Sequence, residues 1–564
     1  MPTDDCLLVT VHCLPLLKGI LNVAVTTNTI DITKLSKTAN GNGSGGYDSA
    51  IIDVQDFFDR VVGGYNEGTG EDELSADMGL ARSIIPAGTG AYRDFSYIAP
   101  EIPAYIQENC TGCMTCVTQC PDTAILGKAI YVEELDNHLA AIENDDERAY
   151  MSNQFAITSK FYKVPERQKK TPGKFGIFID PTKCKGCSEC VEACDDLGYH
   201  ALKMIPKEDT TVPKYQKSIE FFRKLPATPA EFINDRVAVD MMLAEQSMLY
   251  VGGAGSCAGC GEATVIRMWL AALGYKYGAE NVGIAASTGC NTVYGSTYPY
   301  NPYIVPWSNS LFENGPAFAM GIRMRWDQLG WQDKQLWVMG GDGAMLDIGF
   351  QSLSRMMASG MNIKVLILDT QVYSNTGGQT STGSFTGQEA KMYAFGSAKP
   401  GKTELRKEIG RIAMMHPNTF VAQTVAAVPN HFYQAILDAA SFDGPAIVST
   451  YTTCQPEHGV ADDMARHQSK LAVDSRAFPM FVYDPRKGDT IKERLSLKGN
   501  PAADEDWYTI KKTGETIDFL TFARSEGRFA KQFDKEGNPS ETLLMAQADR
   551  LSNWHMLQEM AGVR

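Results

Sequence analysis

Two apolar runs each end in polar residues with the chemistry to bind a charged cofactor. The first run starts at Leu336 and ends in Gly341-Asp342-Gly343, and the second ends in Leu368-Asp369-Thr370. The Asp342 carboxylate is a ligand for Mg²⁺, which prefers one or two protein carboxylates together with phosphate oxygens. The two glycines let the backbone approach a diphosphate closely, and the Thr370 hydroxyl and the Val372 carbonyl could complete the coordination. These residue types therefore predict a diphosphate held through a magnesium ion.

The elements that must position these residues are two neighbouring strands. Residues 336–379 read as a strand, a loop, a helical span, a second strand and a second loop that contains Asn375. Open α/β sheets bind ligands at the carboxyl ends of their strands. The alternative for a bare Gly-Asp-Gly is a turn that binds no phosphate. The length of the spacer and the loop that follows it favour the cofactor site.

Composition excludes several classes of protein. A chain of 564 residues is too long for one core, so several domains are expected. The net charge of −15 and the pI near 5.1 argue against a general nucleic-acid or anionic-membrane surface. No stretch reaches the length of uninterrupted apolar residues that a transmembrane helix needs, and the early apolar segment 7–25 follows two acidic residues rather than the basic start of a secretory signal. We expect a cytoplasmic protein that binds neither nucleic acid nor membrane.

Eight of the 14 cysteines lie in two runs with the same spacing, C-x₂-C-x₂-C-x₃-C. The runs are Cys110, Cys113, Cys116, Cys120 and Cys184, Cys187, Cys190, Cys194. This is the duplication of a bacterial two-cluster ferredoxin, in which three close cysteines bind one [4Fe–4S] cluster and the fourth binds the other. Cys194 is therefore predicted to join the first three cysteines of the first run, and Cys120 to join those of the second. Zinc sites are the alternative, but they usually pair two C-x₂₋₄-C units across a longer loop.

Four more cysteines surround the predicted diphosphate site. Cys257 and Cys260 form a C-x₂-C pair before a predicted helix, and Cys290 and Cys454 each follow an apolar segment. A free cysteine is most often a small buried residue. Because these segments could all end at one edge of the same sheet, we predict a third [4Fe–4S] site close to the cofactor.

A group of basic residues lies beside the second cysteine run: Arg167, Lys169, Lys170, Lys174, Lys183 and Lys185. The simplest interpretation is a solvated loop. The alternative hypothesis is a docking patch for an acidic electron carrier, because complementary charge mainly raises the rate of association.

The order of these motifs resembles the C-terminal half of the pyruvate:ferredoxin (flavodoxin) oxidoreductases, within the 2-oxoacid:ferredoxin oxidoreductase family. The motifs are the ferredoxin repeat, CAGCGE, STGC, GDGAMLDIGF, LDTQVYSNTGGQ and YTTC, over about residues 95–490. The resemblance implies an α/β fold: a thiamine diphosphate-binding, mostly parallel sheet with helices on both faces, preceded by a 2[4Fe–4S] ferredoxin α+β module. The implied domains are a small connector (1–99), the ferredoxin-like domain (100–215), the thiamine diphosphate-binding domain with a proximal [4Fe–4S] site (216–490) and a C-terminal helical tail (491–564).

The resemblance also implies roles for single residues. The proximal cluster would be bound by Cys257, Cys260, Cys290 and Cys454, and Mg²⁺ by Asp342, Thr370 and the Val372 carbonyl. The residues implied to contact thiamine diphosphate are Glu262, Cys290, Gly341, Asp342, Gly343, Thr370, Val372, Asn375 and Thr376. Asn375 would lie near the reacting carbonyl, where one hydrogen-bond donor to developing charge typically contributes about 3 kcal/mol.

The implied reaction is a CoA-acylating oxidation. Pyruvate, coenzyme A and oxidised ferredoxin or flavodoxin would give acetyl-CoA, CO₂ and reduced carrier, reversibly, through three [4Fe–4S] clusters. Two alternatives stay open: the same chemistry on 2-oxoglutarate or another 2-oxoacid, and a non-catalytic electron-transfer subunit. Single-chain members carry a long N-terminal half that binds the aminopyrimidine of the cofactor, and nothing like it is recognisable here. We therefore expect a second subunit that carries the pyrimidine-binding and substrate-binding domains, in a hetero-oligomer with dimeric symmetry.

Overall fold

The structure, a computed structural model, describes residues 54–74, 84–234 and 237–564. The predicted connector therefore lies largely outside the described residues, as do Cys6 and Cys13. The first described elements are α3 (Val54–Asp56), the π-helical turn η2 (Phe57–Val62), α4 (Gly63–Glu67) and α5 (Gly70–Glu73). The residues from Ser49 onward form one compact unit.

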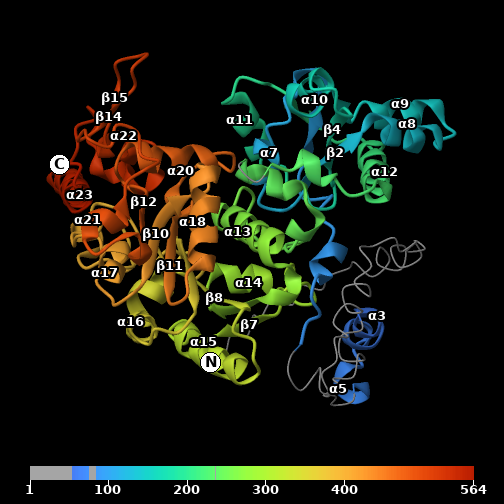
Figure 1. Cartoon of the computed structure of the whole chain (residues 1–564). Coiled ribbons are helices and arrows are strands. Elements are labelled where there is room, and N and C mark those ends of the chain that lie inside the picture. Colours follow the sequence, from blue (N-terminus) through green and yellow to red (C-terminus); the bar gives the residue numbers. More distant parts are fainter. Residues whose placement is uncertain (1–53, 75–83, 235–236) are drawn as a thin grey trace, which may run out of the picture. The chain divides into compact units, whose positions relative to one another are not determined.

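The largest sheet of the described residues has eight strands in the order β13-β12-β10-β11-β9-β8-β6-β7 (Figure 1). The strands are β6 (Val282–Ser287), β7 (Trp307–Ser310), β8 (Gln335–Gly341), β9 (Lys364–Asp369), β10 (Phe420–Val425), β11 (Ala446–Tyr451), β12 (Phe481–Tyr483) and β13 (Leu495–Ser496). All neighbours from β7 to β10 are parallel, whereas β12 and β13 extend the edge in antiparallel orientation. The predicted α/β fold with a mostly parallel sheet is confirmed.

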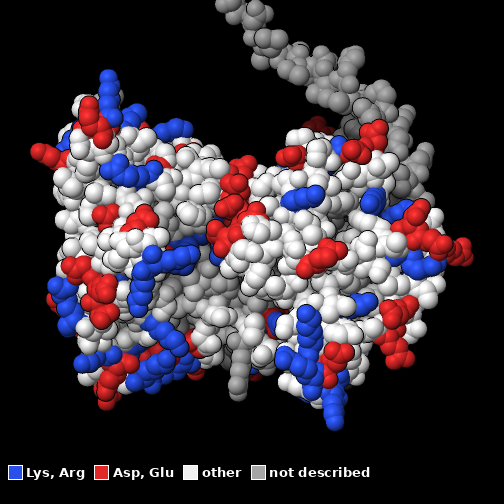
Figure 2. All heavy atoms as spheres, turned by 90° about the horizontal axis from the view of Figure 1, so that it is seen from above, with Lys and Arg blue, Asp and Glu red and all other residues white. Residues whose placement is uncertain are grey.

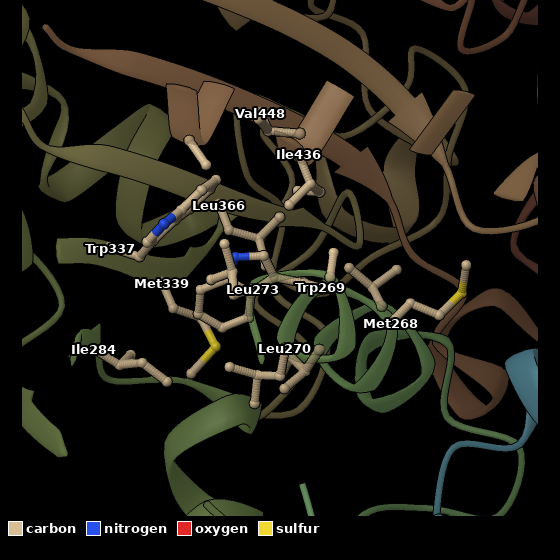
Figure 3. Close-up of a cluster of buried hydrophobic side chains, with 14 of the residues drawn as sticks. Met268, Trp269, Leu270, Leu273, Ile284, Trp337, Met339, Leu366, Ile436 and Val448 are labelled. Atoms are coloured by element: carbon tan, nitrogen blue, oxygen red, sulfur yellow. The ribbon is translucent and has the colours of Figure 1, made fainter. Parts of the chain in front are cut away.

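Helices cover both faces of this sheet because its strands are apolar on both sides. One face carries α13 (Gly261–Tyr277) and α18 (Pro429–Ser441), and the other carries α15 (Gly315–Gln328), α16 (Phe350–Ala358), α17 (Ile409–Met414) and α23 (Glu541–Ala561). Alternate residues of β8 enter the two cores. Trp337 and Met339 pack towards α13 and α18 (Figure 3), whereas Leu336 and Val338 pack on the opposite side. Strands buried on both faces read as continuous apolar runs, which is how they were recognisable in the sequence.

The cysteine-rich segment forms a small antiparallel module. In it β2 (Ile125–Tyr131) pairs with β4 (Gly173–Ile179), β3 (Phe155–Ala156) adds to β4, and β1 (Glu101–Tyr105) pairs with β5 (Leu202–Pro206). Its helices are α7 (Thr115–Gln119), α8 (Val132–Ala140), α9 (Asp145–Ser152), α10 (Val164–Arg167), α11 (Glu189–Asp195) and α12 (Thr211–Lys224). A buried arginine of α13, Arg267, donates to the carbonyl oxygens of Cys120 at 2.8 Å and Ile125 at 3.2 Å. The module is thereby fastened to the helix layer of the large sheet.

The two cysteine runs fold into matching loops. Gly112 and Gly186, which precede the second cysteine of each run, have left-handed φ values of 75° and 68°. Met114 and Ser188, one residue after those cysteines, are also left-handed, at 66° and 65°. Glycine reaches this region without a Cβ clash. The duplicated sequence therefore gives a duplicated backbone.

The sequence predicts a C-terminal helical tail over residues 491–564, but the structure also has strands in this segment. The strand β13 lies beyond residue 490, so the large sheet continues into this segment, and β14 (Tyr508–Thr509) pairs with β15 (Thr516–Ile517) before α22 (Phe519–Arg524) and α23. Four further helices are α14 (Cys290–Gly295), α19 (Gln455–His458), α20 (Ala465–Asp474) and α21 (Ile491–Arg494). No helix of the described residues has the length and apolar character to cross a membrane. Acidic and basic side chains are interspersed over the face in Figure 2.

Candidate functional site

The three residues predicted to bind Mg²⁺ converge at the carboxyl ends of β8 and β9. Thr370 Oγ1 lies 3.2 Å from Asp342 Oδ1 and 3.1 Å from the Val372 carbonyl oxygen. The Thr370 N–H also donates to Asp342 Oδ1, at 3.2 Å. All three residues are buried. They meet because β8 and β9 are parallel neighbours, so that polar residues after the two strands share one edge of the sheet.

The charge of Asp342 has no basic partner among the described residues. Burial raises the pKa of this carboxyl, and the neighbouring Asp369 carboxylate raises it further. The Ser381 hydroxyl donates to Asp342 Oδ2, while Arg406 is paired with Asp369. A buried carboxylate is costly unless it is paired or binds a metal. A divalent cation between Asp342, Thr370 and Val372 would supply the missing charge, so these residues fit Mg²⁺.

A pocket opens beside this cluster. Every predicted cofactor contact except Asp342 lines it. A Cβ on Gly341 would come no nearer to protein than 3.8 Å, from the Leu368 carbonyl oxygen, so the space beside this glycine is open to a ligand. Gly343 has another role, because a Cβ there would lie 2.4 Å from the Tyr373 ring. Of the two predicted diphosphate glycines, Gly341 leaves room for the ligand and Gly343 leaves room for a tyrosine.

The loop after β9 carries the two predicted contacts that face solvent. Asn375 and Thr376 are exposed at its tip and line the pocket. No hydrogen bond joins the Asn375 amide to another described residue, so the amide is available to a ligand. The loop is shaped at its base by Gln371, a buried non-glycine residue with a φ of 57°. Such a conformation persists only when surrounding contacts hold it.

Glu262 lies in the first turn of α13 and lines the same pocket. Burial raises the pKa of this carboxyl to about 8. A carboxyl shifted in this direction takes up a proton more readily, and the protonated form can donate a hydrogen bond as well as accept one.

The four cysteines predicted to form the proximal site line one cavity: Cys257, Cys260, Cys290 and Cys454. Cys257 is exposed, and the other three are half-buried. Burial raises the pKa values of Cys260, Cys290 and Cys454. The residues that line both this cavity and the diphosphate pocket are Glu262, Cys290, Thr370, Ser374 and Asn375. The two predicted sites therefore share a wall.

The structure places the fourth cysteine of each run beside the first three cysteines of the other run. Cys194 of the second run lines a cavity together with Cys110, Cys113 and Cys116. Burial raises the pKa values of the other set, Cys184, Cys187 and Cys190, and the neighbouring Cys120 thiol adds to each shift. No His, Cys, Asp or Glu group of three or more in the described part of the chain is arranged to hold a single metal ion. The thiols of the first set line a cavity instead, and the binding of a cluster by either set stays a prediction.

Known proteins resemble both the cofactor-binding region and most of the chain. Residues 287–450, which include β7 to β10 and the loop after β9, match the family described as thiamine pyrophosphate enzyme, C-terminal TPP binding domain. The chain is 28% identical to the probable pyruvate-flavodoxin oxidoreductase of Escherichia coli, over 90% of this chain and 45% of that protein. It is 26% identical to the pyruvate:ferredoxin oxidoreductase of Moorella thermoacetica, over 91% of this chain and 46% of that one.

The chain is a relative of the pyruvate:ferredoxin (flavodoxin) oxidoreductases. The resemblance read from the motifs is thereby confirmed.

The chain spans slightly less than half of the length of these oxidoreductases. In them the matching region belongs to a single longer chain, so they do not support the expectation that a separate subunit completes the site. A solved structure of 2-oxoglutarate:ferredoxin oxidoreductase from Magnetococcus marinus is 23% identical and covers 36% of this chain and 65% of that one. Its TM-score of 0.31 is too low to support an argument.

Two members of the proposed basic patch are not on the surface. Lys183 and Lys185 are only 4% and 7% exposed, so the surface patch is reduced to the other basic residues of the group. The Lys185 ammonium lies 2.7 Å from Asp122 and donates to the carbonyl oxygens of Ala254 and Ser256, at 3.0 and 2.7 Å. Lysine is almost never buried unless it is paired, and its partners lie too far away in the sequence to be recognised from spacing.

Sequence reasoning also assigns no role to His458, because isolated histidines are usually structural. In the structure His458 Nε2 lies 2.8 Å from the Thr370 carbonyl oxygen, and the Cys454 N–H points to His458 Nδ1 at 3.4 Å. The ring is fully buried, and burial lowers the pKa of this histidine. The position of His458 in the helical turn just after Cys454 is the one feature of the sequence that placed this histidine near the site.

Proposed function

We propose that this chain is the cofactor-binding and electron-relay part of a thiamine diphosphate-dependent 2-oxoacid:ferredoxin or flavodoxin oxidoreductase, with pyruvate as substrate. The observation that carries the proposal is the shared wall between the diphosphate pocket and the four-thiol cavity. A thiamine diphosphate site alone serves many reactions. A thiol site that adjoins it favours removal of electrons from the substrate over protonation.

The residues of the pocket have distinct tasks in this proposal. Asp342, Thr370 and the Val372 carbonyl hold Mg²⁺, and the open space beside Gly341 receives the diphosphate. Thiamine diphosphate, when bound, would stabilise the negative charge that loss of CO₂ leaves on the former carbonyl carbon of the substrate. Asn375, whose amide is free to reach a ligand, donates to the oxygen of the reacting carbonyl.

The electrons and the acyl group leave by different routes. Pyruvate and coenzyme A give acetyl-CoA, CO₂, one proton and two electrons. The cysteines around the proximal cavity would hold one [4Fe–4S] cluster, and the eight cysteines of the module would hold two more. Such clusters would supply one-electron acceptors between the cofactor and ferredoxin or flavodoxin. The pyrimidine-binding and substrate-binding parts are contributed either by the same longer chain, as in the relatives, or by a second subunit of a hetero-oligomer. The proposed compartment is the cytoplasm.

Cofactor analysis of the purified enzyme is the direct test. We expect bound thiamine diphosphate, Mg²⁺ and about twelve iron atoms per chain, four for each of three clusters. Pyruvate should reduce an added ferredoxin only when coenzyme A is present, and the same assay with 2-oxoglutarate and aryl 2-oxoacids identifies the preferred substrate. Iron–sulfur protein without thiamine diphosphate would overturn the proposal in favour of a non-catalytic electron-transfer subunit.

The role of Asn375 is tested separately. Asn375→Ala should lower turnover with pyruvate by about two orders of magnitude, because one hydrogen-bond donor to developing negative charge is lost. Thiamine diphosphate content and iron content should stay at the wild-type level. Unchanged turnover would remove Asn375 from the mechanism.

A further inference from the structure

Three successive carbonyl groups at the base of the cofactor loop have three different partners. The Thr370 carbonyl accepts from His458 Nε2 at 2.8 Å, and the Gln371 carbonyl accepts from Gln388 Nε2 at 3.0 Å and from the Ser384 hydroxyl. The Val372 carbonyl lies 3.1 Å from Thr370 Oγ1, beside Asp342. Two carbonyls are thus bound by side chains from further along the chain, and the third lies at the cation site.

His458 contacts a second backbone segment with its other nitrogen. The Cys454 N–H donates to His458 Nδ1 at 3.4 Å. Since Nδ1 accepts this hydrogen bond, Nε2 carries the proton and donates to Thr370. One neutral ring therefore spans from a residue of the diphosphate pocket to a cysteine of the four-thiol cavity.

Buried charged side chains lie close to this ring. Glu526 Oε1 lies 3.8 Å from His458 Nδ1, and Glu526 accepts from the Tyr451 hydroxyl at 2.8 Å and from Arg528 Nε at 2.6 Å. Arg528 in turn donates to Gln371 Oε1 at 3.1 Å. Gln371 is the residue with the left-handed backbone, so the same group of side chains contacts both the loop and the neighbourhood of the histidine.

We propose that His458 is a positioning residue that couples the cation site to the proximal cysteine site. By binding the Thr370 carbonyl it fixes the peptide that precedes Gln371, and so keeps the Val372 carbonyl turned to the cation. By accepting from Cys454 it fixes the backbone of one thiol ligand. The chemical identity of what the two sites bind rests on the proposed function, whereas the coupling rests on these hydrogen bonds.

Two substitutions separate this role from simple packing. His458→Leu fills much of the ring's volume but has neither a donor nor an acceptor. His458→Gln keeps one N–H and one carbonyl oxygen on a side chain of similar reach. His467→Leu, at an exposed position on α20, is the matched control.

Two readouts are measured on each purified enzyme: the affinity for Mg²⁺–thiamine diphosphate after cofactor removal, and the electron paramagnetic resonance spectra and midpoint potentials of the reduced clusters. We expect His458→Leu to weaken cofactor binding by about tenfold, as is typical when a residue behind a metal ligand is lost. The spectrum of one cluster should change, while the two clusters of the module keep theirs. His458→Gln should restore most of both properties.

Each other outcome is decisive. Equal cofactor affinity and equal cluster spectra in His458→Leu and His467→Leu would overturn the coupling, as would a Gln variant no better than Leu. Should His458→Leu fail to fold, His458→Asn carries the same test, because its shorter amide reaches only one of the two partners. Wild-type enzyme without thiamine diphosphate would overturn the proposed function itself, and the coupling with it.

Discussion

In the first cysteine run, Thr111 and Thr115 occupy the positions that Lys185 and Glu189 occupy in the second. Thr111 is exposed and Thr115 half-buried, whereas Lys185 and Glu189 are buried. The Lys185 ammonium binds Asp122 and the segment just before Cys257. The Glu189 carboxylate accepts from the N–H groups of Ala465 and Arg466, at 3.0 and 2.9 Å, where α20 begins.

The comparison separates what the cysteines determine from what their neighbours determine. Spacing and the left-handed glycines give both runs the same loop and the same ability to surround a cluster. The residues between the cysteines decide where each loop is attached. The second run contacts the chain just before Cys257, through Lys185, and at the start of α20 after Cys454, through Glu189. Under the proposed function, the cluster held mainly by the second run would therefore receive the electrons first. The first run lacks these two contacts, although Arg267 of α13 donates to its Cys120 carbonyl oxygen. Under the proposed function, it is the run that an external carrier would reach.

The largest effect is expected from the exchanged cysteines. Cys120→Ala should remove the cluster held mainly by the second run, and Cys194→Ala the cluster held mainly by the first. Each variant should lose about four of about twelve iron atoms, because one of three clusters is lost. Electron paramagnetic resonance of the reduced enzymes should show that the missing signals differ. Loss of the same signal in both variants would contradict the exchange.

A smaller effect is expected from the buried ion pair. Lys185→Met leaves the Asp122 carboxylate buried without a cation, and breaking a buried pair in this way typically costs about 3–5 kcal/mol. The thermal unfolding midpoint should fall by several degrees. Thr111→Met, the matched change in the first run, should leave the midpoint within about one degree, because exposed substitutions are nearly neutral. Equal shifts of the unfolding midpoint in the two variants would show that the two runs do not differ in how they are attached to the rest of the chain.

The smallest effect is expected from the exposed basic residues. Arg167, Lys169 and Lys170 are exposed, and Phe161, from the same segment, lies 3.0 Å from where a Cβ on Gly112 would be. The segment that carries these residues therefore contacts the loop of the first run at Phe161, although it precedes the second run in sequence. Replacing the three residues by glutamine should slow reduction of an acidic ferredoxin by up to about tenfold at low ionic strength, and the difference should vanish at high salt. Stopped-flow rates that are unchanged at every ionic strength would exclude docking here.

The sequence was most informative where chemistry depends on short spacing. The strands β8 and β9, the convergence of Asp342 with Thr370 and the exchange of Cys120 and Cys194 all follow from local patterns and from the geometry of parallel sheets. The burial of Lys185 and the role of His458 depend on partners that are distant in the chain, such as Ser256, 71 positions away from Lys185. The left-handed Gln371 likewise depends on Ser384 and Gln388. A lysine, a histidine or a glutamine carries no sign of such partners in a single sequence.

The unequal exposure of the thiols has a consequence for how long each site survives in air. Cys257 is exposed, whereas Cys120, Cys184, Cys190 and Cys194 are buried. Oxidants attack accessible sulfur first, and the early steps are reversible while the later ones are not. Damage would therefore begin at the proximal site, next to the cofactor, while the module still carried electrons. An aerobically handled sample would lose turnover with its 2-oxoacid before it lost its iron–sulfur colour.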